Sequence, residues 1–538
     1  MTEILSKLAR RGWGALPASL ALFLLLTLPA VALAADDEEK AWWEEFGPIA
    51  ILLVVITIVF ARLPKVEGLG HTAAYRRRRL MNWLPLGLTY AFFYMGRYNL
   101  KVSKDAFENL QALDGSVLMG NEDFSAIFAI GTLVYGCAFL FNGPLTDRLG
   151  GKKAMMIGGA GIVFVNSLMG LGSLCVLYEK PAGLYTFLAG NFVPAYAVLY
   201  GMNMYFQSFG AVAIVKVNAP WFHVKERGVF GAIFGILISL GLYFAFDWSG
   251  KILDLFERSE GDPFNLGLAF VFFTPAMILA ALWIADLVFV RDTPGQAGFE
   301  DFHTGDATAG DDGPRLGVFE VFAKLLRNPV ILTIALVEFC SGFLRQAIMQ
   351  YYGIFAKQTD SVLHLKSSFV NENWGMMLCC AGILGGVMAG VISDRVFQSR
   401  RGPVAMLLYI VMLFSAVVLA FAYKTPIVGF MVVLMSMAII GVHGMLSGTA
   451  SMDFGGAKNA GTAVGIIDGF VYLGTAVMAG TYYFILPRES GEGLMGVSSD
   501  PVNWWLWPIS MIVVAALGTV FASRVWNAKP KSKGGGGH

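Results

Sequence analysis

The sequence Tyr90–Lys104, YAFFYMGRYNLKVSK, places an arginine about midway along a run of residues that otherwise has membrane-spanning character. Residues 83–95 are almost all apolar or aromatic, so the span continues past Arg97 only if its guanidinium faces protein or water. A second such arginine, Arg345, lies within residues 331–355, ILTIALVEFCSGFLRQAIMQYYGIF. A charge at that depth marks a functional site by default, and two buried guanidinium groups predict an anion site.

The composition defines the broad class of protein. The 538 residues are 56% hydrophobic and only 14% charged, with a mean hydropathy of +0.63, whereas soluble domains are about one quarter charged. This is the composition of a polytopic membrane protein. The net charge of +1 indicates no nucleic-acid partner. The five cysteines lie in apolar segments at spacings that fit neither a metal site nor a disulfide framework, so we expect no metal and no cofactor.

The N-terminal region has features of a targeting segment. Basic residues come first, an apolar stretch covers residues 16–33, and a small-x-small site follows at 32–34, so residues 1–35 are expected to form a signal peptide. The alternative is an uncleaved first helix. Residues 36–75 then hold an extra transmembrane span, at 46–61, and a linker. The positive-inside rule puts residues 36–45 outside and the cluster Arg76–Arg79 in the cytoplasm.

The rest of the chain predicts an all-α membrane protein with two six-helix, pseudo-symmetric bundles. Twelve segments have spanning length: 83–104, 123–146, 154–177, 185–213, 228–247, 266–290, 329–356, 372–393, 404–423, 427–449, 460–486 and 503–525. Alternate connections are basic, which puts the C-terminus in the cytoplasm and the protein in the inner membrane. We expect a first bundle at 76–290, a cytoplasmic linker at 291–328, a second bundle at 329–526 and a disordered tail at 527–538.

The two halves repeat each other in sequence. Arg97 is followed fifty residues later by Asp147, and Arg345 forty-nine residues later by Asp394. Such a repeat predicts a substrate site at mid-membrane, where the halves meet. The Gly-x-x-x-Asp-Arg motifs place a carboxylate at a helix end, where it can clamp or release a neighbouring arginine. The expected gating residues are Asp147, Arg148, Glu226, Arg227, Asp394 and Arg395.

Four further side chains extend the face of Arg97. Tyr90 and Tyr94 precede it by seven and three residues, which is helical spacing. They are expected either to pack or to donate hydrogen bonds to an oxyanion. Lys101 and Lys104 follow on the same face and either reach the ligand or snorkel to the outer surface.

The motif Tyr-x-x-x-Tyr-x-x-Arg-x-Asn of residues 90–99 resembles the first helix of the organophosphate:phosphate antiporters. This family is a branch of the major facilitator superfamily that includes glycerol-3-phosphate and hexose-phosphate transporters. The resemblance covers roughly residues 75–526 and includes Trp221-Phe-x-x-x-Glu-Arg-Gly228, Arg291-Asp-Thr-Pro294, Arg345, Ser393-Asp-Arg-Val-Phe397 and Lys458-Asn-Ala-Gly-Thr-Ala-Val-Gly465. It implies a major facilitator fold and exchange of an organic phosphate for inorganic phosphate, with one arginine of each half, Arg97 and Arg345, holding the phosphate.

The sequence also departs from that family. Phe139 and Ile238 stand where the glycerol-3-phosphate transporter resembled here has lysine and histidine, whereas Lys104 resembles a lysine of the eukaryotic sugar-phosphate exchangers. Glu338 and Asp468 are intramembrane acids without an obvious counterpart. One interpretation is that they form salt bridges to Arg345, Lys101 or Lys104. The other is that they serve a cationic group on the substrate or a proton-coupled step.

The sequence therefore predicts a transporter, not an enzyme, that exchanges a small phosphorylated organic anion for inorganic phosphate across the lipid bilayer, as a monomer. Two alternatives are a proton-coupled symporter of another organic anion or zwitterion and a membrane sensor of a phosphate ester. The sequence shows no pairing of a nucleophile with a general base of the kind that would suggest an enzyme. It also shows no large partner-binding domain of the kind that would suggest a sensor.

Overall fold

A computed structural model describes residues 71–223, 227–257, 264–302, 329–397, 401–491 and 494–527, together with 320, 323, 326 and 327. The expected signal peptide, nearly all of the expected extra span and linker, and the tail after residue 527 lie outside these residues. The side chains of residues 227–234, 391, 394–395 and 448–460 are also outside the description.

The first half is built from long helices that cross the molecule. They are α4 (Ala73–Glu108), α5 (Asn121–Leu149), α6 (Gly151–Tyr178), α7 (Ala182–Gly190), α8 (Phe192–Asn218), η2 (Ala219–Trp221), α9 (Arg227–Tyr243), the π-helical η4 (Phe244–Trp248), α10 (Ser249–Phe256), α11 (Gly267–Phe289) and η5 (Gly295–Ala297). The start of α4 is capped by Thr72, whose Oγ1 accepts a hydrogen bond from the backbone N–H of Tyr75.

The second half repeats this arrangement. Its elements are α13 (Pro329–Met349), α14 (Tyr351–Gln358), α15 (Asp360–Leu363), α16 (Phe369–Glu372), α17 (Trp374–Arg395), α18 (Arg401–Ala422), α19 (Ile427–His443), the π-helical η6 (Gly444–Ala450), α20 (Ser451–Ile485), η7 (Pro501–Trp504) and α21 (Leu506–Arg524). Within the described ranges there are only isolated β-bridges and no strand.

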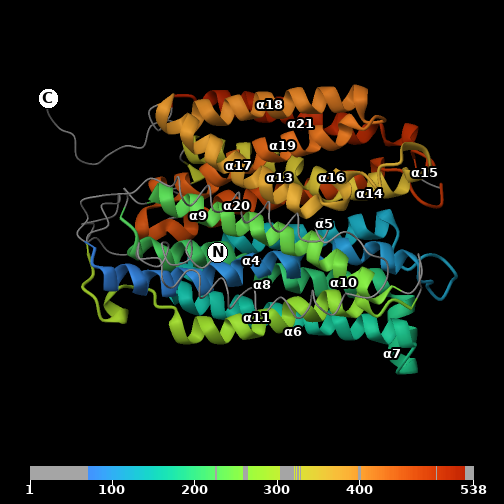
Figure 1. Cartoon of the computed structure of the whole chain (residues 1–538), viewed down its shortest axis with the longest axis horizontal. Coiled ribbons are helices and arrows are strands. Elements are labelled where there is room, and N and C mark those ends of the chain that lie inside the picture. Colours follow the sequence, from blue (N-terminus) through green and yellow to red (C-terminus); the bar gives the residue numbers. More distant parts are fainter. Residues whose placement is uncertain are drawn as a thin grey trace, which may run out of the picture.

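The twelve expected spans each coincide with a helix or a pair of consecutive helices. Ten described helices, some of them joined end to end, are long and apolar enough to cross a membrane, and α4 and α17 cover the other two expected segments. The segment 185–213 differs from the expectation of one continuous span. The chain breaks at Asn191, and the short helix α7 extends away from the bundle next to it (Figure 1).

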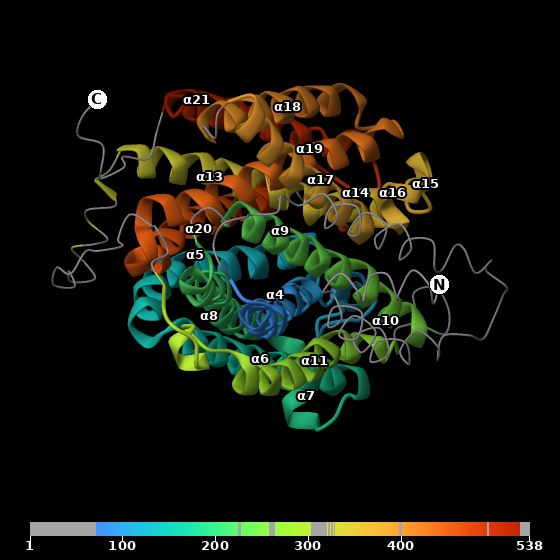
Figure 2. The same cartoon turned by 60° about the vertical axis from the view of Figure 1, so that its left-hand side comes forward.

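The two bundles lie against each other along their length. Figures 1 and 2 show α13, α17, α18, α19 and α21 on one side and α4, α6, α8 and α11 on the other, with α5, α9 and α20 between them. Glycines let α5 and α20 approach closely, because a Cβ on Gly143 would lie 2.7 Å from the Gly461 carbonyl oxygen, and one on Gly465 would lie 2.5 Å from that of Phe139.

Contacts join the halves at both ends of this interface. We call the end that carries Asp292, where the segment between the halves begins, the linker end, and the end that carries Glu489 the far end. At the linker end, Asp147 accepts hydrogen bonds from the Thr462 backbone N–H and hydroxyl, both at 3.0 Å. At the far end the cross-half partners are Ser125 with Tyr351, Asn121 with Gln358, Lys104 with Glu489, Glu122 with Arg488 and Asp105 with Lys357.

Candidate functional site

The position of Arg97 is fixed by a polar face of α8. Three side chains of that helix donate hydrogen bonds to carbonyls within about one turn of α4: Gln207 to that of Phe93 at 2.9 Å, Asn203 to that of Gly96 at 2.8 Å and Tyr200 to that of Arg97 at 3.1 Å. Because buried polar groups need such partners, these bonds set the rotation and height of α4. Arg97 consequently points into the interface between the halves.

The Arg97 guanidinium bridges the two halves. Nη1 donates to the hydroxyl of Tyr472 on α20 at 2.8 Å, and Nη2 donates to Oε1 of Gln207 at 3.2 Å. The guanidinium carbon lies 4.4 Å from the ring centre of Tyr94 and 4.9 Å from that of Tyr135, distances at which a cation is attracted to a ring. Tyr94 thus lies against the Arg97 guanidinium, and its expected role at an oxyanion stays a prediction. Tyr90 lies next to Tyr94, with 5.5 Å between ring centres.

Arg345 approaches the same point from α13. Its guanidinium carbon lies 5.5 Å from the Tyr472 ring centre, so one tyrosine contacts both arginines. The neighbouring Gln346 donates a 2.9 Å hydrogen bond to the hydroxyl of Tyr98 on α4, which ties the two halves together beside Arg345. The arginines are therefore brought together, as the sequence repeat predicts.

Both guanidinium groups are buried and have unused donors. Arg97 is 1% exposed and Arg345 is 4% exposed. Nε of Arg97, and Nε and Nη2 of Arg345, have no hydrogen-bond partner, and neither arginine forms an ion pair among the described residues. Buried N–H donors without partners are costly, and a guanidinium fork suits the oxygens of a phosphate or carboxylate. The arrangement can bind an anion between the halves.

Aromatic rings complete the wall around the arginines. Tyr135 lies 4.0 Å from Tyr472, ring centre to ring centre, and Phe139 stacks on Tyr472 with 5.7 Å between centres and 10° between planes. Phe139 is one of the two positions at which the sequence departs from the glycerol-3-phosphate transporters. The structure places this apolar ring against Tyr135 and Tyr472, two rings that contact Arg97.

The two intramembrane acids do not form the salt bridges that the first interpretation expected. The Glu338 carboxylate pairs with His443 of α19, with 3.0 Å between Oε2 and Nδ1, and its other oxygen has no partner. The Asp468 carboxylate accepts a hydrogen bond from the Ser447 hydroxyl. Ser447 lies in the π-helical turn η6, which follows His443 directly, so the turn helps to bring these side chains together.

Lys104 lies away from the arginines and belongs to the far-end contacts. Its Nζ lies 2.8 Å from Oε2 of Glu108 and 3.3 Å from Oε1 of Glu489, in the opposite half. Lys101 has Asp105 and Lys104 as charged neighbours. In this conformation Lys104 therefore joins the two halves at the far end, and neither of the two interpretations made from the sequence describes its contacts.

The expected gating residues are only partly described. Asp147 forms an ion pair with Lys216, 2.8 Å from Nζ to Oδ1, and its bonds to Thr462 cross the interface. Arg148 is exposed. Glu226 lies outside the described residues, as do the side chains of Arg227, Asp394 and Arg395. The expected clamp of a neighbouring arginine, such as Arg227, by the carboxylates of the Gly-x-x-x-Asp-Arg motifs therefore remains a prediction.

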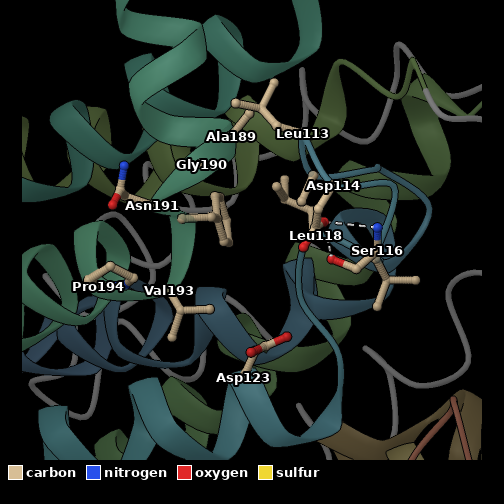
Figure 3. A pocket seen from close by; sticks show the side chains of 13 residues that line it. Leu113, Asp114, Ser116, Leu118, Asp123, Ala189, Gly190, Asn191, Val193 and Pro194 are labelled. Carbon is tan, nitrogen blue, oxygen red and sulfur yellow. Dashed lines mark hydrogen bonds between the residues drawn. The ribbon is translucent and has the colours of Figure 1, made fainter.

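A separate pocket of about 250 Å³ opens at the far end and contains neither arginine. Figure 3 shows it between the loop after α4, the α7–α8 connection and the start of α5, with Asp123 on one side. Its lining residues are Ala112, Leu113, Asp114, Ser116, Val117, Leu118, Asp123, Ala189, Gly190, Asn191, Phe192, Val193 and Pro194. The Asp114 carboxylate accepts hydrogen bonds from Ser116, so it stabilises the loop itself.

Sequence reasoning missed several residues of the site: Tyr98, Tyr135, Gln207, His443 and Tyr472. Tyr472 follows Asp468 by one helical turn, a spacing that could have indicated a shared face. Tyr135 and Gln207 lie in ordinary apolar spans, where a single polar or aromatic side chain gives no comparable signal.

The fold and the buried arginines define a membrane transporter with two related halves. Residues 86–479 match the Major Facilitator Superfamily, and the chain belongs to this family. The solved structures similar to it include a D-xylose-proton symporter, with a TM-score of 0.56 and 14% identity, covering 84% of this chain and 98% of that one. A fucose:proton symporter of E. coli, FucP, has a TM-score of 0.52 and 12% identity, with 83% and 99% covered. These likenesses concern the fold.

Sequence relatives confirm the resemblance to organophosphate transporters. The chain is 24% identical over 500 residues to the glycerol-3-phosphate transporter of Bacillus subtilis, covering 88% of this chain and 99% of that protein. It is 23% identical over 421 residues to the membrane sensor protein UhpC of Salmonella typhimurium, with 75% and 85% covered. A probable hexose phosphate transport protein of Chlamydia pneumoniae is 21% identical over 416 residues, with 74% and 81% covered.

Proposed function

We propose that this protein exchanges a phosphate ester for inorganic phosphate by alternating access. The observation that carries the proposal is the pair of buried arginines, one from each half, which have N–H donors without a partner and which both lie against the Tyr472 ring. A phosphate group supplies acceptors for both forks at once. The names of the relatives, which transport glycerol 3-phosphate or hexose phosphates, support the same substrate class.

Exchange follows from the cost of burying two positive charges. In a low-dielectric site the two guanidinium groups repel each other, and an anion between them replaces this repulsion by attraction. A loaded site therefore reorients more readily than an empty one. Either a phosphate ester or inorganic phosphate meets this requirement, so the carrier returns loaded with one or the other.

The proposal also concerns membrane placement. We propose that the linker end and the C-terminus face the cytoplasm, because the positive-inside rule assigns the basic linker-end connections to that side. We further propose that the protein is a monomer of the inner membrane. A multi-pass arrangement is consistent with the ten described spans.

The test is counterflow by purified protein in vesicles. Vesicles loaded with inorganic phosphate should take up labelled phosphate esters, and vesicles without an internal anion should not. Net uptake without an internal anion would contradict the proposal and favour a symporter. Ester binding without transport would favour a sensor.

A further inference from the structure

Two carboxyl groups of the second half lie on the helices that carry Tyr472 and Arg345. Asp468 precedes Tyr472 by four residues on α20, and Glu338 precedes Arg345 by seven residues on α13. At about 1.5 Å per residue, these steps put the acids roughly 6 Å and 10 Å along the helix axes from the two residues of the anion site. Asp468 interacts electrostatically with Glu338, His443 and Arg345. Both acids lie toward the linker end.

Neither acid forms an ion pair with a lysine or arginine in the described part of the chain. Asp468 is 5% exposed and its side chain is bonded to a neutral hydroxyl, that of Ser447. Glu338 is 0% exposed; His443 occupies Oε2, and Oε1 has no partner. A buried carboxylate oxygen without a donor carries a substantial desolvation cost. The pair therefore presents carboxyl acceptors to any group that enters beside the arginines.

Resting on the proposed exchange function, we propose that the substrate is a phosphate ester that carries a primary ammonium group. Its phosphate binds to Arg97 and Arg345, and its ammonium group binds to Asp468 and Glu338. A zwitterionic ligand then complements the whole site, because its phosphate meets the arginines and its ammonium group meets the carboxyl groups.

An ammonium group fits these acceptors better than a hydroxyl does. An ammonium group offers three hydrogen-bond donors and a positive charge, so it can hydrogen-bond to a carboxylate and neutralise its charge, whereas a hydroxyl provides one neutral donor. His443 acts as a positioning residue, because it holds one oxygen of Glu338 and leaves the other for the ligand. The spacing suits an ester in which a short chain or one sugar ring separates the phosphate from the amine.

The test compares matched ligands that differ only in amine against hydroxyl. Binding to the purified full-length protein in detergent is measured by isothermal titration at one pH, for 2-aminoethyl phosphate against 2-hydroxyethyl phosphate and for glucosamine 6-phosphate against glucose 6-phosphate. In at least one pair the amine should bind about tenfold more tightly, as expected for a charge-assisted hydrogen bond gained. This comparison of amine with hydroxyl ligands uses the wild-type protein alone, so misfolding of a variant does not affect it.

Variants then locate the preference. Asp468→Asn and Glu338→Gln should bring the amine-to-hydroxyl ratio close to one while the hydroxyl ester still binds. The matched control is Asp286→Asn, because Asp286 is a buried acid of the first half that accepts from Thr89 at 2.7 Å, and this variant should keep the wild-type ratio.

The outcomes separate this inference from the exchange function. Equal binding of amine and hydroxyl in both pairs, or no binding of either amine, overturns the inference. If hydroxyl esters exchange with phosphate in vesicles while the ratio is one, the exchange function stands and the inference fails. If the amine preference is present but internal phosphate drives no uptake, the inference about the ligand stands and the exchange function fails.

Discussion

The hydroxyl of Tyr472, in the second half, accepts a 2.8 Å hydrogen bond from Nη1 of Arg97, in the first half. The same ring faces Arg345, which belongs to its own half. A rocking motion between the halves therefore separates Arg97 from Tyr472 and leaves Tyr472 with Arg345. In the proposed exchange cycle, opening the site breaks this hydrogen bond of a buried cation, and a phosphate that accepts from Arg97 replaces it.

Replacing either arginine by lysine should impair exchange severely. Arg97→Lys and Arg345→Lys keep the charge but lose the fork of donors that engages two phosphate oxygens. We expect exchange in phosphate-loaded vesicles to fall by about a factor of 100, as for the loss of hydrogen bonds to a charged group. Arg524→Lys, at the exposed end of α21, is the control and should exchange like the wild type. Substantial exchange by Arg345→Lys present at wild-type levels in the vesicles would refute the clamp.

Removing the Tyr472 hydroxyl tests the bridge between the halves. Tyr472→Phe keeps the ring beside both guanidinium groups but removes the acceptor of Arg97. In a double-mutant cycle with Arg97→Lys, the effects on the dissociation constant for phosphate should be non-additive by about 1 kcal/mol, because both changes remove the same contact. Additive effects would show that the hydroxyl and the guanidinium act independently.

The spans and the two buried arginines could be predicted from the sequence because each depends on local hydropathy and on one conspicuous charge. Arg97 and Arg345 stand out in apolar runs, and only protein or an anion can accommodate them. The partners of the acids could not be predicted in the same way. Glu338 meets His443 from another helix, and the π-helical turn before α20 determines the position of Ser447.

The position of Lys104 shows the limit of reasoning from one helical face. It follows Arg97 by seven residues and so shares its face, but α4 continues to Glu108, and seven residues move Lys104 about 10 Å toward the far end. There it meets Glu489, in a connection after α20 that helical periodicity does not describe. The sequence does not predict the helix break at Asn191, before α8, because the residues on both sides of it are apolar and read as one continuous span.

Neutralising Glu489 should loosen the far end. Glu489→Gln weakens the ion pair with Lys104, which we expect to stabilise the contact between the halves by about 1 kcal/mol. Its loss should therefore raise the exposed population of the interface roughly fivefold. The readout is the rate at which an impermeant thiol reagent labels Ser125→Cys, a position that contacts Tyr351 across the interface at 2.8 Å. The protein without the added cysteine corrects for its native thiols.

The matched control is Lys357→Gln, which removes the more exposed ion pair with Asp105 and should change the labelling rate less, since solvent screens it. The double variant Lys104→Glu with Glu489→Lys exchanges the two charges, and its labelling rate should return part of the way toward that of the protein with both native residues. An unchanged rate in Glu489→Gln would show that this ion pair does not hold the far end closed.

The positive-inside rule predicts the orientation of the chain. A cysteine that replaces Asp254, in α10 at the far end, should react with an impermeant thiol reagent from outside the cell. A cysteine at Ala307, in the linker and outside the described residues, should react only after the membrane is permeabilised. The reverse pattern would overturn the proposed orientation.

Uptake driven by a pH gradient tests whether protons replace phosphate as the coupling species. Vesicles with an imposed gradient but without internal phosphate or ester should show no concentrative uptake, since exchange needs an anion on the far side. Glu338→Gln and Asp468→Asn should change the selectivity among esters and leave counterflow dependent on that anion. If one of these acids carries a proton, its amide variant should instead lose gradient-driven accumulation and keep exchange, because exchange needs no net change of protonation. Glu338 is paired with His443 whereas Asp468 is bonded to Ser447, so each amide variant is measured separately. Sustained concentrative uptake by the wild type under these conditions would replace the antiporter with a proton-coupled symporter.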